Sequence, residues 1–176
     1  MTESNKNIGN LDIKSRKMEL QNINILQDEF GDVAYRGVER QHVSIGYNVG
    51  MERLTRLLKE KKFSKEKFME SPTESIREFL YGFFKERGGN LPAVWVEDKT
   101  VYLITEFGEK CVTIEAEKQI KVCHKDICNL YCRAFVKGMV QIFEDLFPGI
   151  MINFYNQSSR RVENNDCIEA FQIVIP

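Results

Sequence analysis

The hydrophobic pattern changes its period near residue 148, and this change restricts the fold more than any other feature of the chain. From 126 to 147, apolar residues recur every three or four positions, which is the spacing of one face of a helix. Pro148 and Gly149 then supply a helix stop. The runs "IMINFYN" and "CIEAFQIVI" follow with the composition of strands, separated by the polar loop "QSSRRVENND". The last third of the chain therefore predicts a long helix followed by two strands.

The earlier part of the chain predicts two helices and a β-meander. A first helix follows Asp32 and continues to "KEKKF", and a second begins in "SPTES", where Pro72 fits the first helical position and Glu74 completes a capping box. "AVWVEDKTVYLIT" predicts a hairpin that turns at Asp98-Lys99, with further strands in "KCVTIEAE" and "QIKVC". We therefore expect an α+β fold made of N-terminal helices, an antiparallel β-meander, a long helix and two C-terminal strands.

Length and composition predict one domain without a nucleic-acid or membrane partner. A chain of 176 residues that is 43% hydrophobic can bury one substantial core. We expect residues 1–30 to form a flexible N-terminal arm and residues 31–176 to form a single domain. The net charge of −1 gives no electrostatic reason to expect nucleic acid or an anionic membrane. A polar start and no run near the ~18 apolar residues of a spanning helix predict a cytoplasmic protein.

Three of the five cysteines and one of the two histidines fall in "VCHKDICNLYC", residues 122–132. Cys128 and Cys132 lie on the predicted inner face of the long helix, and Cys167 begins a strand that can approach that helix. Thiolates one helical turn apart can share a metal ion, and zinc accepts sulfur and imidazole ligands together. The candidate zinc ligands are Cys123, His124, Cys128, Cys132 and Cys167.

Two other interpretations of the cysteines stay open. An odd number of cysteines without an export signal argues for reduced thiols or metal ligands over a disulfide framework. The helix cysteines can equally be small hydrophobic residues of the core, as Cys111 is in its alternating strand. Cys128 also lies near a predicted helix N-terminus, where the macrodipole favours a thiolate, so a nucleophile paired with His124 is a further hypothesis.

The order of elements, with "IGYNVGMERLTRLL", "CNLYCRAFVKGMVQIF" and "ENNDCIEAFQIVI", resembles the four-vinyl reductase or hydrocarbon-binding domain family. That family shares its α+β ligand-binding fold with TRAPP transport subunits and haem nitric-oxide sensors. By this resemblance, Cys128 or Cys132 matches the helix cysteine of the family. Gly138 and Cys167 match its helix glycine and final cysteine. Ser159 stands where a further cysteine is expected and "ENND" lacks the usual glycine, so a zinc site of the family type needs a substitute ligand.

Two further resemblances concern chemistry. A cysteine before an aromatic-containing strand, here Cys167, is similar to the end of the family related to aminothiazoline carboxylate hydrolases, which implies a cysteine- or metal-dependent hydrolase. The haem sensors imply a haem group, but His42 and "YNQSSRR" have the wrong order and spacing for it. A buried, hydrogen-bonded histidine is therefore expected at position 42.

The resemblance also implies a cavity between the helices and the concave side of the sheet, suited to a small hydrophobic molecule. Gly46 and Gly50 each cost the first helix about 1 kcal/mol of propensity, so a helix or a ligand is expected to pack closely there. The candidate ligand-binding residues are Gly46, Gly50, Phe79, Phe83, Trp95, Tyr102, Phe135 and Met139. The same side chains would serve equally as core. Tyr155, Arg160 and Arg161 could hold an anionic group, although solvated loop residues are the simpler interpretation.

Together these features predict a cytoplasmic domain that binds or senses a small hydrophobic molecule and forms a homodimer, and in which the cysteine cluster either binds zinc or packs beside the pocket. The alternatives are the hydrolase and a protein-interaction module like the transport subunits. The interaction module predicts an exposed apolar patch on the first two helices.

Overall fold

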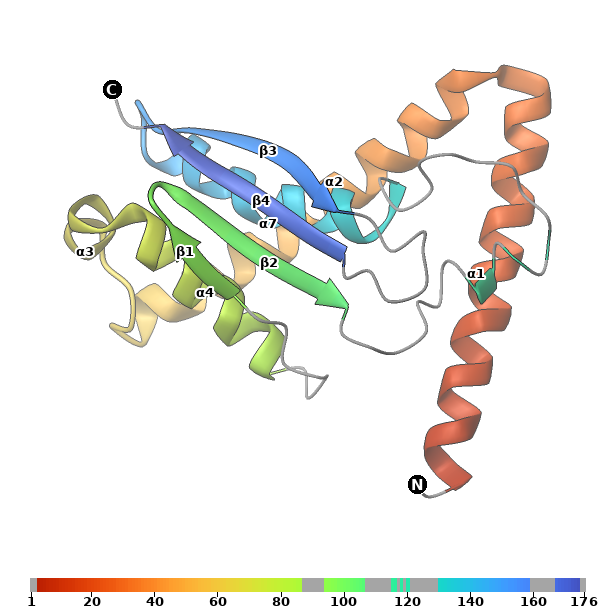
Figure 1. The fold of residues 1–176 in the computed structure, drawn as a ribbon, viewed down its shortest axis with the longest axis horizontal. Coiled ribbons are helices and arrows are strands. Elements are labelled where there is room, and N and C mark those ends of the chain that lie inside the picture. Colours follow the sequence, from red (N-terminus) through yellow and green to blue (C-terminus); the bar gives the residue numbers. More distant parts are fainter. Residues whose placement is uncertain are drawn as a thin grey trace.

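The computed structural model describes residues 3–86, 94–106, 115–116, 118, 120, 130–158 and 167–174 (Figure 1). The elements follow in the order α1 (Glu3–Phe30), α2 (Asp32–Lys59), α3 (Lys65–Glu70), α4 (Pro72–Glu86), β1 (Val94–Glu97), β2 (Thr100–Glu106), α7 (Cys132–Leu146), β3 (Met151–Ser158) and β4 (Cys167–Val174). The predicted α+β fold with an antiparallel sheet is confirmed. None of the helices in these residues is both long and apolar enough to span a membrane.

The four strands form one antiparallel sheet in the order β1-β2-β4-β3. The predicted hairpin between β1 and β2 is confirmed, and Asp98 takes φ 52° in its turn, a backbone conformation that Asp tolerates better than most residues. The last strand, β4, lies between β2 and β3, with Phe171 paired to Val101 on one side and to Phe154 on the other. β3 is therefore an edge strand of the sheet.

Alternation along the strands separates two faces of the sheet. Val101 and Leu103 of β2 and Phe171 and Ile173 of β4 are buried in the main core. Figure 1 shows α4 and α7 lying against one side of the sheet, with α2 alongside α7. Side chains at the intervening positions, such as Tyr102, point to the opposite face.

A short helix that the sequence analysis missed, α3, completes the main core. Its Phe68 is fully buried, and its ring stacks on Phe143 of α7 and on Phe147 with centroids 5.1 and 4.0 Å apart. α3 has six residues and one buried apolar side chain. A helix of this length shows no recognisable hydrophobic period, which explains why the sequence did not predict it.

Within residues 1–30, for which the sequence predicts an arm, Glu3–Phe30 form the helix α1. Gly31, at φ 61°, joins α1 to α2. A second, smaller core holds α1 through Leu20 and Ile23, which pack near Tyr131 at the start of α7. Arg16 adds a cation–π contact, with its guanidinium carbon 3.9 Å from the centre of the Tyr131 ring. From residue 14 onward, where the side chains of α1 are described, Leu20 and Ile23 are the buried apolar ones, and two such positions leave too weak a pattern to predict this helix.

Two other sequence predictions differ from the structure in part. Residues 115–116, expected in the strand "KCVTIEAE", are helical, and so are 118 and 120. Ala116 is fully buried in the smaller core with Leu20 and Ile23 of α1. This packing favours the helix over the strand that the local sequence pattern predicted. The long helix, expected from 126, begins at Cys132 in the structure. The rest of both strand predictions and residues 126–129 lie outside the described residues.

Candidate functional site

α2 and α7 approach each other backbone to backbone. A Cβ atom on Gly46 would lie 1.9 Å from the carbonyl oxygen of Phe135, and one on Gly138 would lie 2.0 Å from that of Val43. Gly50 faces α7 in the same way, with 3.0 Å to the nearest carbonyl oxygen. The close neighbour of Gly46 and Gly50 is thus a helix, and its packing offsets the helix propensity that glycine costs.

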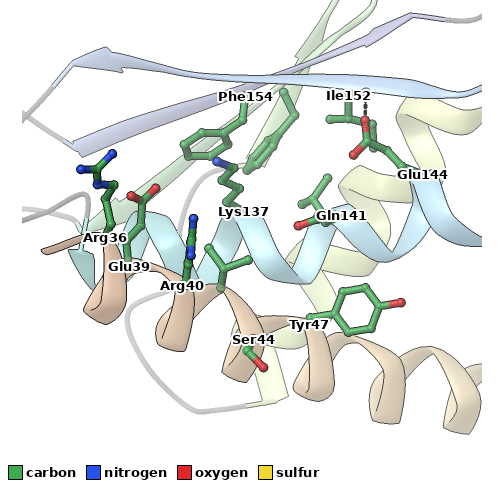
Figure 2. Close-up of a pocket in the computed structure, with 13 residues that line it drawn as sticks. Arg36, Glu39, Arg40, Ser44, Tyr47, Lys137, Gln141, Glu144, Ile152 and Phe154 are labelled. Carbon is green, nitrogen blue, oxygen red and sulfur yellow. Dashed lines mark hydrogen bonds between the residues drawn. The ribbon is translucent and has the colours of Figure 1, made fainter. Parts of the chain in front are cut away.

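A groove of about 650 Å³ opens along one flank of this helix pair, between α2, α7 and the sheet at its β3 edge (Figure 2). Its apolar floor consists of Val43, Val140, Ile152, Phe154 and Phe171. Its polar lining consists of Arg36, Glu39, Arg40, Ser44, Tyr47, Lys137, Gln141 and Glu144. Because the two helix backbones touch, the side chains that flank their contact form the walls of the groove.

The polar groups of the groove are separated along its length. Figure 2 shows Arg36, Glu39 and Arg40 at one end and Tyr47 and Glu144 toward the other. Glu144 Oε1 accepts a hydrogen bond of 2.7 Å from the backbone N–H of Ile152, which ties α7 to the edge strand. A hydrogen bond to Asp145 raises the pKa of Tyr47 above its ordinary value.

The basic end of the groove has three cations from two helices. Arg36 and Arg40 lie one turn apart on α2, and Lys137 projects from α7. All three side chains are exposed. Within the residues described, none of the three forms an ion pair. The groove therefore combines an apolar floor with a positively charged end.

A second, smaller pocket of about 370 Å³ includes Phe83, one of the predicted ligand-binding residues. Its cations are already paired, because Arg53 and Arg56 both donate to the carboxylate of Glu86. These ion pairs lower the pKa of Glu86, with the hydrogen bond from Arg53 as the largest cause. This pocket offers less space and less unpaired charge than the groove.

The other predicted ligand-binding residues do not meet in one cavity. Phe79, Phe83 and Met139 belong to the main core, and Phe135 packs against it. Trp95 and Tyr102 are cross-strand partners whose rings stack with centroids 5.1 Å apart. Their neighbours in β1 and β2 point into the core, so both rings lie on the opposite face of the sheet. The predicted residues Gly46 and Gly50 lie in the contact between the two helices.

The predicted zinc ligands are only partly within the described residues. Cys123, His124 and Cys128 lie outside them. Cys132, expected to point inward, is exposed at the first residue of α7, whereas Cys167 is buried at the first residue of β4. Among the residues that the structure describes, no three His, Cys, Asp or Glu side chains are close enough to hold a metal ion.

His42 lies where α2 meets the smaller core. Its Nδ1 is 3.0 Å from the carbonyl oxygen of Val38, and its ring meets the Tyr131 ring edge-on with centroids 4.8 Å apart. Burial raises the pKa of Tyr131 to about 12. The half-buried, hydrogen-bonded histidine agrees with the interpretation preferred from the sequence.

A buried ion pair joins the start of α7 to β4. Arg133 Nε donates to Glu169 Oε1 at 2.7 Å, and neither side chain is exposed. The spacing of the apolar residues from 126 to 147 predicts that Arg133, with Lys137 and Gln141, lies on the solvent-facing side of the helix, and for Arg133 this prediction is wrong. The sequence held a signal for this pair, since Glu169 stands at an inward position of "CIEAFQIVI", where a carboxylate requires a buried partner.

The groove was not predicted from the sequence either. Arg36, Arg40, Ser44 and Tyr47 recur at helical spacing beside the apolar stripe of α2, and this row was the available signal. The row lines a groove only because α7 and β3 pack beside α2, and this packing cannot be read from the sequence of α2 alone.

Comparisons of the chain with protein-family models, curated proteins and solved structures gave no match.

Proposed function

We propose that this domain binds a small hydrophobic molecule in the groove between α2, α7 and β3. The observation that carries the proposal is the apolar floor of a groove of about 650 Å³. Binding sites for small molecules have about 300–1,000 Å³, mostly apolar walls and a few polar groups that orient the ligand. The resemblance to hydrocarbon-binding domains suggests the same class of ligand on independent grounds.

Blocking the groove from its rim tests this proposal without disturbing the core. Ser44 is exposed and lines the groove, so Ser44→Trp would fill the space that a ligand needs. Gln41→Trp is the matched control, because Gln41 is exposed on the same helix and is not part of the lining. With decanol as probe in titration calorimetry, we expect Ser44→Trp to weaken binding by about tenfold or more and Gln41→Trp to leave it unchanged. Equal binding by both variants, or no binding by the unaltered protein, contradicts the proposal.

We infer a second candidate function, protein interaction, from the exposed apolar residues around the turn between α1 and α2. Their exposed fractions run from 42% to 63%. The residues are Met18, Ile25, Leu26, Phe30 and Val33. An apolar cluster on projecting helices is the kind of surface that a partner covers, and a second copy of this chain is the simplest one. This cluster supports the homodimer expected from the sequence.

Light scattering after size exclusion tests the homodimer. Phe30→Asp should shift the protein toward the mass of a monomer, because a charge on the contact surface must be desolvated. Met69→Asp is the control, since Met69 is equally apolar and half exposed on α3, away from the turn. A strict monomer for the unaltered chain at high concentration would remove the dimer from consideration.

We also propose that the cysteine cluster holds a structural zinc ion, a hypothesis that comes from the sequence. The Arg133–Glu169 contact brings the start of α7 near the start of β4, so Cys132 and Cys167 begin elements that meet at one end of the sheet. Elemental analysis should find about one zinc per chain, lost in Cys167→Ser and retained in the control Cys111→Ser. If the unaltered protein is metal-free, the zinc hypothesis is refuted.

The alternative hydrolase hypothesis, without a metal, needs a reactive Cys128, which a thiol-alkylation assay would detect as rapid modification of that residue. Cytoplasmic location stays a prediction.

A further inference from the structure

We propose that the ligand of the groove is an anionic amphiphile, an apolar chain ending in a carboxylate or phosphate, and that Arg36, Arg40 and Lys137 hold its anionic group. The proposal rests on the proposed function, because it names the chemical class of ligand for the same groove. Its basis is the combination of an apolar floor and a basic end in one continuous lining.

The three cations converge from two helices. Arg36 and Arg40 extend from successive turns of α2, and Figure 2 shows Lys137 reaching from α7 toward Phe154 of the floor. A guanidinium presents paired N–H donors that match the oxygens of a carboxylate or phosphate. An anionic group at this end would therefore receive hydrogen bonds from both helices.

Two basic side chains elsewhere in the molecule already have carboxylate partners. Arg53 lies 2.6 Å from a carboxylate oxygen of Glu86, and Lys67 lies 2.9 Å from one of Glu78. In the part of the chain that the structure describes, the three groove cations have no such carboxylate partner. A ligand anion could thus pair with them without breaking an existing ion pair.

Two carboxylates also line the groove, and their positions decide the orientation of the ligand. Glu144 lies toward the far end, where it accepts from the backbone of Ile152. Glu39 lies at the basic end, so three cations face one carboxylate there. The positive excess places the anionic group near Arg36 and Arg40, and the apolar chain then runs along the floor toward Ile152.

An amphiphile fits this lining better than either of its parts. A neutral hydrocarbon would use the floor but leave the cations solvated. A small inorganic anion would meet exposed cations in water, where ion pairs contribute little to binding. A chain that carries both groups gains apolar burial and charge-assisted hydrogen bonds together.

Calorimetry with four decyl compounds tests the charge of the ligand at constant chain length. Decanoate, decyl phosphate, decanol and decyltrimethylammonium are compared below their micelle concentrations, at low salt and about pH 7.5, where a carboxylate is ionised. We expect the two anions to bind about tenfold or more tighter than decanol, and the cation to bind most weakly. Inorganic phosphate alone should bind far more weakly than decyl phosphate.

Variants locate the anionic group. The double variant Arg36→Gln, Arg40→Gln should reduce decanoate affinity to the level of decanol while leaving decanol affinity unchanged. Lys59→Gln is the control, an exposed cation on α2 outside the groove. If decanol and decanoate bind equally, the anionic amphiphile is refuted and the proposed function stands. If no decyl compound binds, both fail, and if phosphate alone binds as tightly as decyl phosphate, the amphiphile is refuted in favour of a simple anion site.

Discussion

At the scale of single residues, the buried pair of Arg133 and Glu169 links stability to pH. Burial raises the pKa of Glu169 to about 7, and the nearby Arg133 only partly opposes this rise. A Glu in the unfolded chain titrates near pH 4.3, so between about pH 4.3 and 7 the folded protein holds a proton that the unfolded chain has released. The stability that this proton contributes is fully present below that range and is lost as the pH rises through it.

Replacing Glu169 by Gln should remove this pH dependence. From pH 5 to 7.5, we expect the unaltered protein to lose about 2–3 kcal/mol more unfolding free energy than Glu169→Gln does. Urea unfolding at a series of pH values measures the difference. The control is Glu78→Gln, because Glu78 is exposed and its ion pair with Lys67 lies in solvent. Parallel pH profiles for the unaltered protein and Glu169→Gln would show that Glu169 is ionised throughout.

At the scale of elements, the contact between α2 and α7 builds the groove. Gly46 and Gly138 make the same kind of contact from opposite sides. Each glycine lacks a Cβ at the point where a backbone carbonyl of the other helix comes close. This approach holds the two helix axes close and fixes which side chains flank the contact. The groove walls follow from it, because Arg40 and Lys137 can face the same space only if the helices meet in this register.

Gly138→Ala should therefore destabilise the protein and weaken ligand binding. Its Cβ would meet backbone atoms of α2, which cannot yield as a flexible side chain could, so we expect a loss of about 3 kcal/mol in denaturant unfolding. Gly37→Ala is the matched control on α2, because a Cβ there has no neighbour within 4 Å. That substitution should stabilise the helix by about 0.5–1 kcal/mol. Similar effects of both substitutions would contradict the close contact.

At the scale of the whole molecule, two separate hydrophobic cores stabilise different parts of the chain. The main core joins the sheet to α2, α3, α4 and α7, while the smaller core attaches α1 near Tyr131. Figure 1 shows α1 standing to one side of the body that the sheet and the other helices form. A helix held by few buried side chains can detach without global unfolding.

Leu20→Ser should release α1 and leave the main core intact. Leu20 is fully buried in the smaller core, so its loss should cost about 3 kcal/mol of local stability. Limited proteolysis should then cut faster between residues 14 and 31, while the main thermal transition stays in place. Gln21→Ser is the control, because Gln21 is exposed on the same helix and lies outside the apolar cluster around the turn. A lowered main transition in Leu20→Ser would mean that the two cores unfold together.

Several elements could be predicted because their signals in the sequence are local. α2 begins at Asp32, α4 begins at Pro72, the hairpin turns at Asp98, and both C-terminal strands lie where their alternation predicted. Capping residues, stops and hydrophobic period act within a few residues, so they can be read without knowing what packs against them. The α+β class follows from the order of these elements.

Which residues meet depends on how the elements pack, and local signals do not predict it. Cys132 was expected inside and is exposed, while Arg133 was expected outside and is buried against Glu169. The first turn of α7 packs against α2, and its Arg133 contacts Glu169 of β4. These neighbours determine which side chain of the turn is buried, and the hydrophobic pattern of the helix alone does not. The same reason applies to the groove, because Arg40 and Lys137 are far apart in sequence and share a space only after α2 and α7 have packed.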